Sequence, residues 1–336
     1  MTTYEGLRDS YKQILYNFLH HKNEQSLYEA QQFSKRVIEE QISPEEIVSI
    51  HLEVIEDLYP NLSSETRKSF EILLEVMIGY GMAYREHQIL KNKQLELESE
   101  IDVAANMQHT FLPKEIPQLA DADIGVISVP ASKMSGDYYN IVKDGNEYIA
   151  IALADIIGKG VPAALCMSMI KYAMDSLPEQ LLQPGQLLAS LNRTVEQNIA
   201  ANMFVTMMYA SYDPATHIFS YSGAGHEPGF YYDASEDRFN ELYAKGLALG
   251  ISRDTQYREY QQSLSVGDFV VLFSDGVTEC RNGDRFLERG ELAELIRKYQ
   301  DKTAQEIVDN VYRELENWQD FQLHDDFTLL LLRREV

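Results

Sequence analysis

The stretch YIAIALADIIGKG, residues 148–160, decides the fold of the second half of this chain. Its first seven residues form an unbroken apolar run, which is typical of a buried strand. The run ends at Asp155, and the turn Gly158-Lys159-Gly160 follows soon after it. One Asp at a strand end is usually a turn former, so the meaning of Asp155 depends on what accompanies it.

Further short runs that favour strands lie on both sides of this stretch, separated by turn signals such as Asp213-Pro214 and Gly267-Asp268. Because longer helical segments are grouped between these runs and do not alternate with them, the pattern predicts an α+β fold with mostly antiparallel sheets. The predicted strands are 124–129, 148–154, 203–212, 218–222, 229–232, 269–273 and 327–332, and the predicted helical segments are 162–177, 184–201 and 289–318.

The chain before this region has a helical pattern, with four helices and short connections that suggest a bundle. Ser43-Pro44 is a clear helix start, with Ser43 as N-cap and Pro44 in the first turn, and Ser63 or Ser64 begins the next helix. We predict a helical domain at 1–83, a helical linker at 84–118 and a β-rich domain at 119–336. The linker pattern fits either a short coiled coil or a single connecting helix.

Bulk properties exclude several classes of function. The net charge of -24 makes nucleic acids and acidic membrane surfaces poor partners. The two cysteines, Cys166 and Cys280, provide neither a disulfide framework nor zinc spacing, which fits a reducing compartment. No signal peptide and no run of about 18 apolar residues is present. We therefore expect a cytoplasmic protein.

Acidic residues recur at the ends of the predicted strands. Asp275 ends the run DFVVLFSD, Asp325 and Asp326 directly precede FTLLLL, and Asp137 lies in SGDYYN. Carboxylates that converge at the edge of an apolar core repel one another unless a cation neutralises them. A ligand set made only of acidic oxygens suits magnesium, manganese or calcium. Three or four such carboxylates can hold two ions about 4 Å apart, which activate a water for attack on phosphorus.

Other hydrolytic chemistries do not fit the residues. A cysteine phosphatase needs Arg six positions after its Cys, but Tyr172 and Phe286 occupy those positions. The sequence contains no Gly-x-Ser-x-Gly of a serine hydrolase and no P-loop. A structural calcium site would favour an Asp-x-Asp-x-Asp-Gly loop, which is missing. These exclusions leave the chemistry to metal ions and water.

The acidic motifs, in their order along the chain, resemble those of the metal-dependent (PPM) protein phosphatases, the protein phosphatase 2C family. The similarity is greatest to the bacterial branch that regulates sigma factors, and the helical N-terminal part is also similar to stress-response phosphatases of that branch. The segments that carry the resemblance are 134–139 (MSGDYY), 154–160 (ADIIGKG), 223–228 (GAGHEP), 273–279 (FSDGVTE) and 325–328 (DDFT).

This resemblance implies a sandwich of two antiparallel sheets flanked by helices, with two manganese or magnesium ions. Asp155 would bridge both ions, Asp137 and the backbone carbonyl of Ile156 would bind one, and Asp275 and Asp325 would bind the other. Asp326 is the alternative to Asp325, because adjacent acids are not separated by sequence. The ligand after the bridging Asp is Ile156, where larger family members have Gly, but a backbone carbonyl needs no particular side chain.

The resemblance also implies a pathway. The substrate would be a phosphorylated anti-anti-sigma protein in a general stress response, and the N-terminal domain would form a homodimer and bind a kinase-like activator. Two other functions remain as alternatives, a signalling scaffold without catalysis and a different two-metal phosphoryl-transfer enzyme. His226 and His324 are candidate proton donors or structural residues. Lys133 and Lys159 are candidate phosphate ligands or solvated surface lysines.

Overall fold

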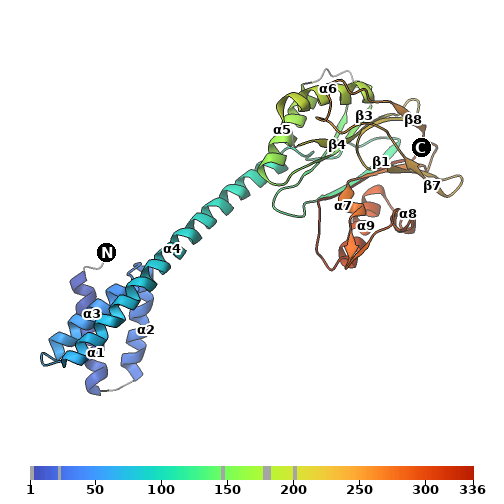
Figure 1. Cartoon of the computed structure of the whole chain (residues 1–336). Coiled ribbons are helices and arrows are strands. Elements are labelled where there is room, and N and C mark those ends of the chain that lie inside the picture. The colour runs from blue at the N-terminus through green and yellow to red at the C-terminus, as the bar shows by residue number, and fades with distance from the viewer. Residues whose placement is uncertain (1–3, 22–23, 145–147, 177–182, 200–202) are drawn as a thin grey trace. The chain divides into compact units, whose positions relative to one another are not determined.

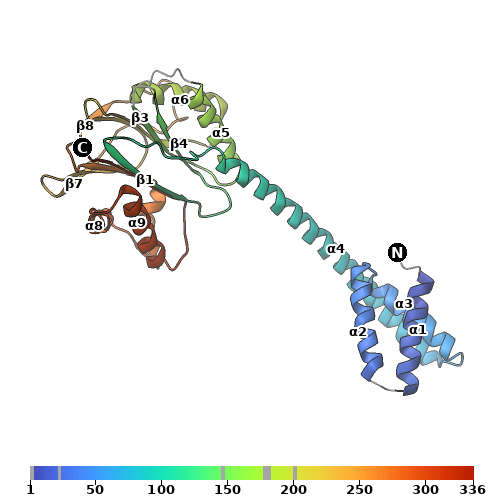
Figure 2. The ribbon, with the colours of Figure 1, turned by 180° about the vertical axis from the view of Figure 1, so that it is seen from behind.

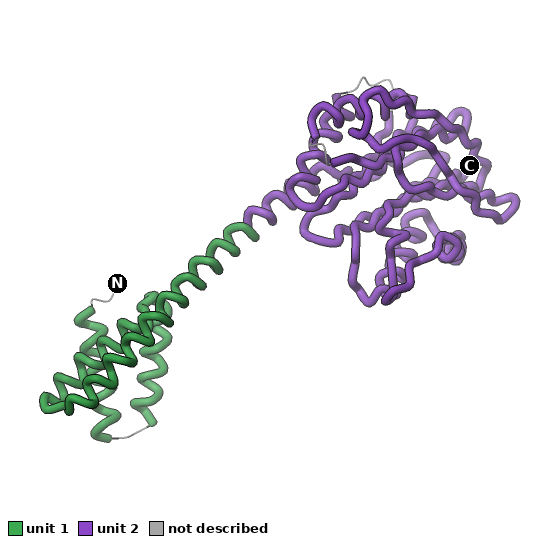
Figure 3. The backbone as a smooth tube through the Cα atoms, in the orientation of Figure 1, with its two compact units in different colours: residues 1–98 green, residues 99–336 purple. Residues whose placement is uncertain are grey.

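The structure is a computed structural model that describes residues 4–21, 24–144, 148–176, 183–199 and 203–336. The chain divides into two compact units, Met1–Glu98 and Ser99–Val336, which Figure 3 shows in different colours. The division falls inside the predicted linker, 84–118. Each unit has its own apolar core.

The first unit consists of helices around a small core, as the sequence predicts. Phe33, Ile50 and Val54 are buried at its centre. Ser43 is the N-cap of the third helix, although its hydroxyl accepts no hydrogen bond from that helix, and Ser63 caps the fourth by accepting the N–H of Thr66 at 3.2 Å. The helices are α1 (Tyr4–His21), α2 (Glu24–Glu39), α3 (Pro44–Leu58) and α4 (Ser64–His109).

The second unit contains two five-stranded antiparallel sheets (Figures 1 and 2). The first sheet has the order β1 (Ala122–Val129), β12 (Phe327–Arg334), β9 (Phe269–Phe273), β6 (Gly229–Asp233) and β7 (Arg238–Leu242). The second has the order β2 (Asp137–Lys143), β3 (Ile149–Ile156), β4 (Val205–Asp213), β5 (Ile218–Ala224) and β8 (Tyr260–Ser263).

Helices cover the outer face of each sheet, so the unit is a sandwich of two sheets flanked by helices, as predicted. Both faces of the central strands are therefore buried. In β12, Leu330 packs between the sheets while Leu329 packs against the helices, which explains the continuous apolar run of that strand. The covering helices are α5 (Val161–Asp175) and α6 (Pro184–Asn198) on the second sheet, and α8 (Arg289–Lys298) and α9 (Ala304–Trp318) on the first.

The structure departs from the sequence prediction in two respects. The segment 289–318 is two helices, because Thr303 caps α9 through a capping box with Glu306. The strands β2, β7 and β8 are not among the predicted ones, and neither is the short pair β10 (Arg281–Asn282) and β11 (Arg285–Phe286). The predicted ends of two helical segments, Leu177 and Ala201, lie outside the described residues.

Among the described residues, no helix combines the length and the apolar character that a membrane span requires.

Candidate metal centre

Asp137 and Asp155 are directly opposite each other on neighbouring strands of the second sheet. Asp137 is the first residue of β2, and in the antiparallel register it pairs with Asp155 near the end of β3. Antiparallel partners have neighbouring side chains on the same face of the sheet. The ladder alone therefore brings two carboxylates together.

Asp137 is a buried carboxylate held between the two sheets. It is only 1% exposed, and its Oδ2 accepts a hydrogen bond of 2.6 Å from the hydroxyl of Thr328, which lies on β12 of the other sheet. Burial raises the pKa of Asp137 well above its usual value, and the nearby carboxylates of Asp155 and Asp326 raise it further. A divalent cation would remove this penalty, because it stabilises the ionised carboxylate.

Asp155 and Asp275 experience the same crowding of negative charge. Burial raises the pKa of Asp155 to about 7, with further contributions from Asp275, Asp325, Asp326 and Glu279. Asp275 follows β9 as the first residue of the short helix α7 (Asp275–Thr278). Burial raises its pKa to about 6, and Glu279 and Asp325 add to the effect.

Asp325 and Asp326 have different surroundings. Asp326 is 7% exposed, and both of its carboxylate oxygens accept backbone hydrogen bonds, from the N–H of Ala131 at 2.7 Å and from that of Gly136 at 2.6 Å. The side chain of Asp325 is 34% exposed, and its Oδ1 lies 3.3 Å from the Nζ of Lys159. Asp326 therefore anchors the loop 131–136, while Asp325 faces the cluster at its open side.

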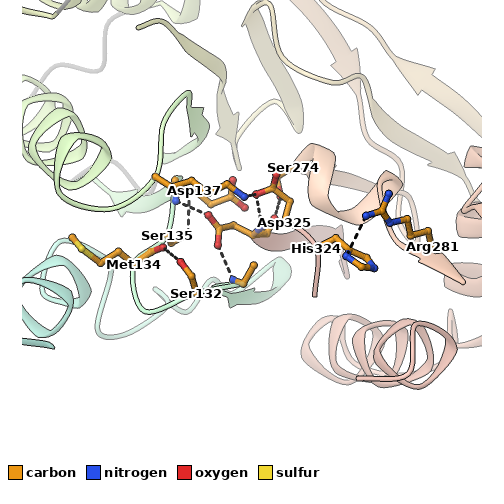
Figure 4. A network of polar contacts seen from close by, with 12 residues as sticks. Ser132, Met134, Ser135, Asp137, Ser274, Arg281, His324 and Asp325 are labelled. Carbon is orange, nitrogen blue, oxygen red and sulfur yellow. Dashed lines mark hydrogen bonds and ion pairs between the residues drawn. The ribbon is translucent and has the colours of Figure 1, made fainter. Parts of the chain in front are cut away.

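The loop 131–136 positions Asp137 through Ser135 (Figure 4), and the end of α4 holds the loop in turn. The N–H of Asp137 donates to the Oγ of Ser135 at 3.0 Å. The buried amide of Gln108 donates to the carbonyl of Ser135 at 2.6 Å and accepts from its N–H at 3.0 Å. The last turn of α4 therefore has two polar contacts with the loop that begins β2.

The backbone carbonyl of Ile156 lies in the same region. A Cβ atom added to Gly136 would be 3.1 Å from the oxygen of Ile156 and 3.5 Å from Asp155 Oδ1 and Asp326 Oδ2. Glycine at position 136 thus leaves room for these three oxygens. The side chain of Ile156 points into the core instead, where it is buried against α5 and α6.

The two histidines differ in their environments. His226 is buried, its Nδ1 lies 3.0 Å from the hydroxyl of Thr206, and burial lowers its pKa to about 4. A neutral buried imidazole of this kind favours the structural role. His324 is exposed, and its Nδ1 lies 3.4 Å from a guanidinium nitrogen of Arg281 (Figure 4).

Sequence reasoning did not find several of these contributors. Glu279 lies four residues after Asp275, a spacing that could have placed both carboxylates on one side of a helical turn. The roles of Thr328 and Gln108 depend on contacts between distant segments, for which the local sequence carries no signal. Lys133 pairs with Asp102 of α4, so its ammonium already has a carboxylate partner.

The donor set suits a hard divalent cation, although the side chains do not form a compact ligand cage. Among the residues that the structure describes, no group of three or more His, Cys, Asp or Glu side chains is close enough to hold a metal ion. Carboxylate and carbonyl oxygens are the ligands that magnesium and manganese prefer, so the residues present fit such ions.

Comparison with known structures defines the class of protein. The SiaA-PP2C domain of Pseudomonas aeruginosa has a TM-score of 0.64 at 19% identity, over 72% of this chain and 99% of that chain. The crystal structure of RsbX in complex with magnesium has a TM-score of 0.50 at 15% identity, over 66% of this chain and 99% of that chain. The fold is that of the PP2C-type phosphatases, which confirms the predicted sandwich.

Sequence comparison then gives the family. The family model "Stage II sporulation protein E (SpoIIE)" matches residues 145–335, and the model "Phosphoserine phosphatase RsbU, N-terminal domain" matches residues 9–83. Phosphoserine phosphatase RsbU of Bacillus subtilis (strain 168) is 57% identical over 332 residues, which cover 99% of each chain. This chain belongs to the RsbU family of metal-dependent serine phosphatases.

Proposed function

We propose that this phosphatase removes phosphate from serine or threonine of an anti-anti-sigma protein in a cytoplasmic general stress response. Its activity is controlled by a kinase-like activator that binds the N-terminal domain. The observation that carries the catalytic part is the gathering of Asp137, Asp155, Asp275 and Asp325 from both sheets, with raised pKa values at Asp137, Asp155 and Asp275. Sites of this kind are typical of catalysis.

The proposed metal ligands are those that the family resemblance implies. Asp137, Asp155 and the carbonyl of Ile156, together with Asp275 and Asp325, would hold two manganese or magnesium ions. The contacts of Asp326 support its exclusion, because both of its oxygens already accept backbone N–H groups. When bound, the two ions supply an activated water and neutralise the phosphate.

The protein itself contributes the geometry. Thr328 fixes one oxygen of Asp137, so the orientation of that carboxylate is set by the other sheet. Asp326 fixes the loop 131–136 through Ala131 and Gly136. Preorganised ligands of this kind are important because a displacement of about 1 Å can cost roughly 100-fold in rate.

The N-terminal unit contains a groove suited to an activator. Its volume is about 930 Å³, and its apolar walls come from α2, α3 and α4. Amphipathic helices of partner proteins commonly bind in such grooves. Residues that line it include Phe33, Ile38, Ile47, Tyr80 and Ile89.

The helix α4 supports the proposed dimer and the transmission of the signal. Leu90 and Leu97, seven residues apart, are 60% and 50% exposed on this helix, which favours a second copy as partner. Gln108, in the last turn of the same helix, contacts the loop that positions Asp137. An activator that shifts α4 would therefore move the loop 131–136 and, with it, the carboxylate of Asp137.

The experiment that tests the catalytic proposal measures phosphate release from a phosphoserine protein with manganese, with and without a chelator. Asp155→Asn should abolish release. Asp213→Asn is a matched control, because Asp213 ends β4 at the far end from Thr206, the residue that pairs with Asp155. Chelator-insensitive release, or equal activity of Asp155→Asn and wild type, would refute the metal mechanism. Metal binding without release in the presence of the activator would favour the scaffold.

A further inference from the structure

Lys159 is the basic residue that touches the carboxylate cluster. Its Nζ lies 3.3 Å from Oδ1 of Asp325. Within the described parts of the chain, no other lysine or arginine forms an ion pair with Asp137, Asp155, Asp275 or Asp325. This contact is notable in a chain with a net charge of -24, because the carboxylates of the cluster repel an approaching phosphate dianion.

The backbone around Lys159 has an unusual conformation that glycine permits. Gly158 has φ +118° and Gly160 has φ +75°, both in the region that other residues avoid. A Cβ atom on Gly160 would meet nothing within 4 Å, so the conformation, not lack of space, requires glycine there. The turn between β3 and α5 thereby places Lys159 four residues after Asp155, at the margin of the cluster.

The ion pair between Lys159 and Asp325 is weak enough to be exchanged. The side chain of Lys159 is 64% exposed, and such surface pairs contribute little to stability. A lysine ammonium is a compact charge on a flexible stem, and it is a common ligand of phosphate. When a divalent cation takes the carboxylate of Asp325, the ammonium loses its partner while remaining beside the site.

We propose that Lys159 is the residue that binds the substrate phosphate, and that Asp325 holds its ammonium until a metal ion and the phosphate replace this contact. The proposal rests on the proposed function. It assigns Lys159 to substrate binding, whereas a purely structural ion pair would leave phosphate affinity unchanged. Lys133 and Arg289 are weaker candidates, because their carboxylate partners, Asp102, Glu227 and Glu241, lie outside the proposed ligand set.

The test measures binding of inorganic phosphate to the manganese-loaded full-length protein by calorimetry. Lys159→Gln should weaken phosphate binding about ten- to hundredfold, the loss expected for one charge-assisted hydrogen bond. Lys159→Arg should restore most of the affinity. Lys171→Gln is the matched control, because Lys171 pairs with Asp175 on α5 and should bind phosphate as wild type does.

Manganese affinity, titrated without phosphate, separates the proposed role from an effect on the metals. Lys159→Gln should bind manganese at least as tightly as wild type, because the ammonium competes for Asp325. Weaker manganese binding by Lys159→Gln would overturn the proposal. Phosphate binding by Lys159→Gln equal to that of wild type, or no phosphate binding by wild type, would also overturn it.

Enzyme assays distinguish failure of this proposal from failure of the proposed function. With a phosphoserine protein, Lys159→Gln should lower kcat/KM about ten- to hundredfold, mainly through KM, with rescue by Lys159→Arg. If Asp155→Asn is inactive while Lys159→Gln is fully active, the metal mechanism stands and the role of Lys159 is refuted. If wild type releases no phosphate even with the activator present, the proposed function fails, and the phosphate titrations still decide the role of Lys159.

Discussion

Thr328 on β12 donates a hydrogen bond of 2.6 Å to the carboxylate of Asp137 on β2, 191 positions earlier in the chain. The two strands belong to different sheets of the sandwich. This bond therefore fixes the candidate metal ligand against the opposite sheet. Substituting Thr328 therefore tests how far the site depends on the packing of the two sheets.

Removing this hydrogen bond should weaken the site without unfolding it. Thr328→Val keeps the shape of the side chain but removes one of the hydroxyl donors to Asp137, which should cost ~1–2 kcal/mol of stability. We expect manganese affinity to fall about tenfold, and Thr328→Ser to retain most of it. Calorimetric titration of the three proteins checks this. Wild-type affinity in Thr328→Val would show that Asp137 needs no such support.

The pH dependence of stability should reveal the crowded carboxylates when divalent ions are chelated. The folded-state pKa values of Asp155 and Asp275 are about 7 and about 6, above the ordinary 3.8. A raised carboxyl pKa means that the folded protein holds protons which the unfolded chain releases. Each such carboxyl group therefore adds to the stability of the folded state at low pH. This stabilisation is lost as the pH rises from about 4 through the folded-state pKa values.

This sign gives a measurable difference between wild type and Asp155→Asn. In chelator at pH 8, the variant should be more stable by ~1–3 kcal/mol. Wild type must hold an ionised, partly buried Asp155 beside other carboxylates, whereas the variant has a neutral Asn there. At pH 4 the two proteins should be similar. Chemical denaturation at both pH values measures the difference. A variant less stable than wild type at pH 8 would contradict the claim that the ionised carboxylates of this cluster repel one another and destabilise the metal-free protein.

Asp325 and Asp326 should respond differently to the same substitution. Asp326→Asn removes a charged acceptor from two buried N–H groups and should cost ~1–3 kcal/mol of stability. Asp325→Asn should leave stability within ~0.5 kcal/mol of wild type but remove phosphatase activity. Thermal unfolding and phosphate release measure the two effects. The reverse pattern, a stable and inactive Asp326→Asn, would make Asp326 the ligand.

Gln108 should couple the end of α4 to the catalytic loop. Its amide makes two hydrogen bonds to the backbone of Ser135, so Gln108→Leu should leave the loop 131–136 less ordered. We expect stimulation by the activator to fall several-fold, while activator binding is unchanged. Gln94→Leu is the control, because the side chain of Gln94 bonds to Glu98 on the same helix. Normal stimulation of Gln108→Leu would place the coupling elsewhere.

The sequence predicted the parts of this protein that depend on local pattern. The strand that ends at Asp155 is apolar throughout because helices and sheet bury both faces, and such runs are conspicuous. The start of α3 at Pro44 follows from proline's preference for the first helical position, where its missing N–H has no partner to lose. The strand β2 was not predicted, because its polar start at Asp137 interrupts the expected apolar pattern and its position is fixed by pairing with β3.

The candidate site could be predicted only in part for the same reason. The carboxylates were found because each lies beside a recognisable strand or turn. The different roles of Asp325 and Asp326 arise from contacts with Lys159, Ala131 and Gly136, which are far away in sequence. No local rule distinguishes two adjacent aspartates when long-range packing decides which one is buried.

The most direct test of the central claim is a crystal structure of the full-length protein grown with manganese, with anomalous scattering recorded to locate the ions. We predict two manganese peaks that share the carboxylate of Asp155. One should also contact Asp137 and the carbonyl of Ile156, and the other Asp275 and Asp325. Crystals that bind manganese with no peak at Asp155 would contradict the account.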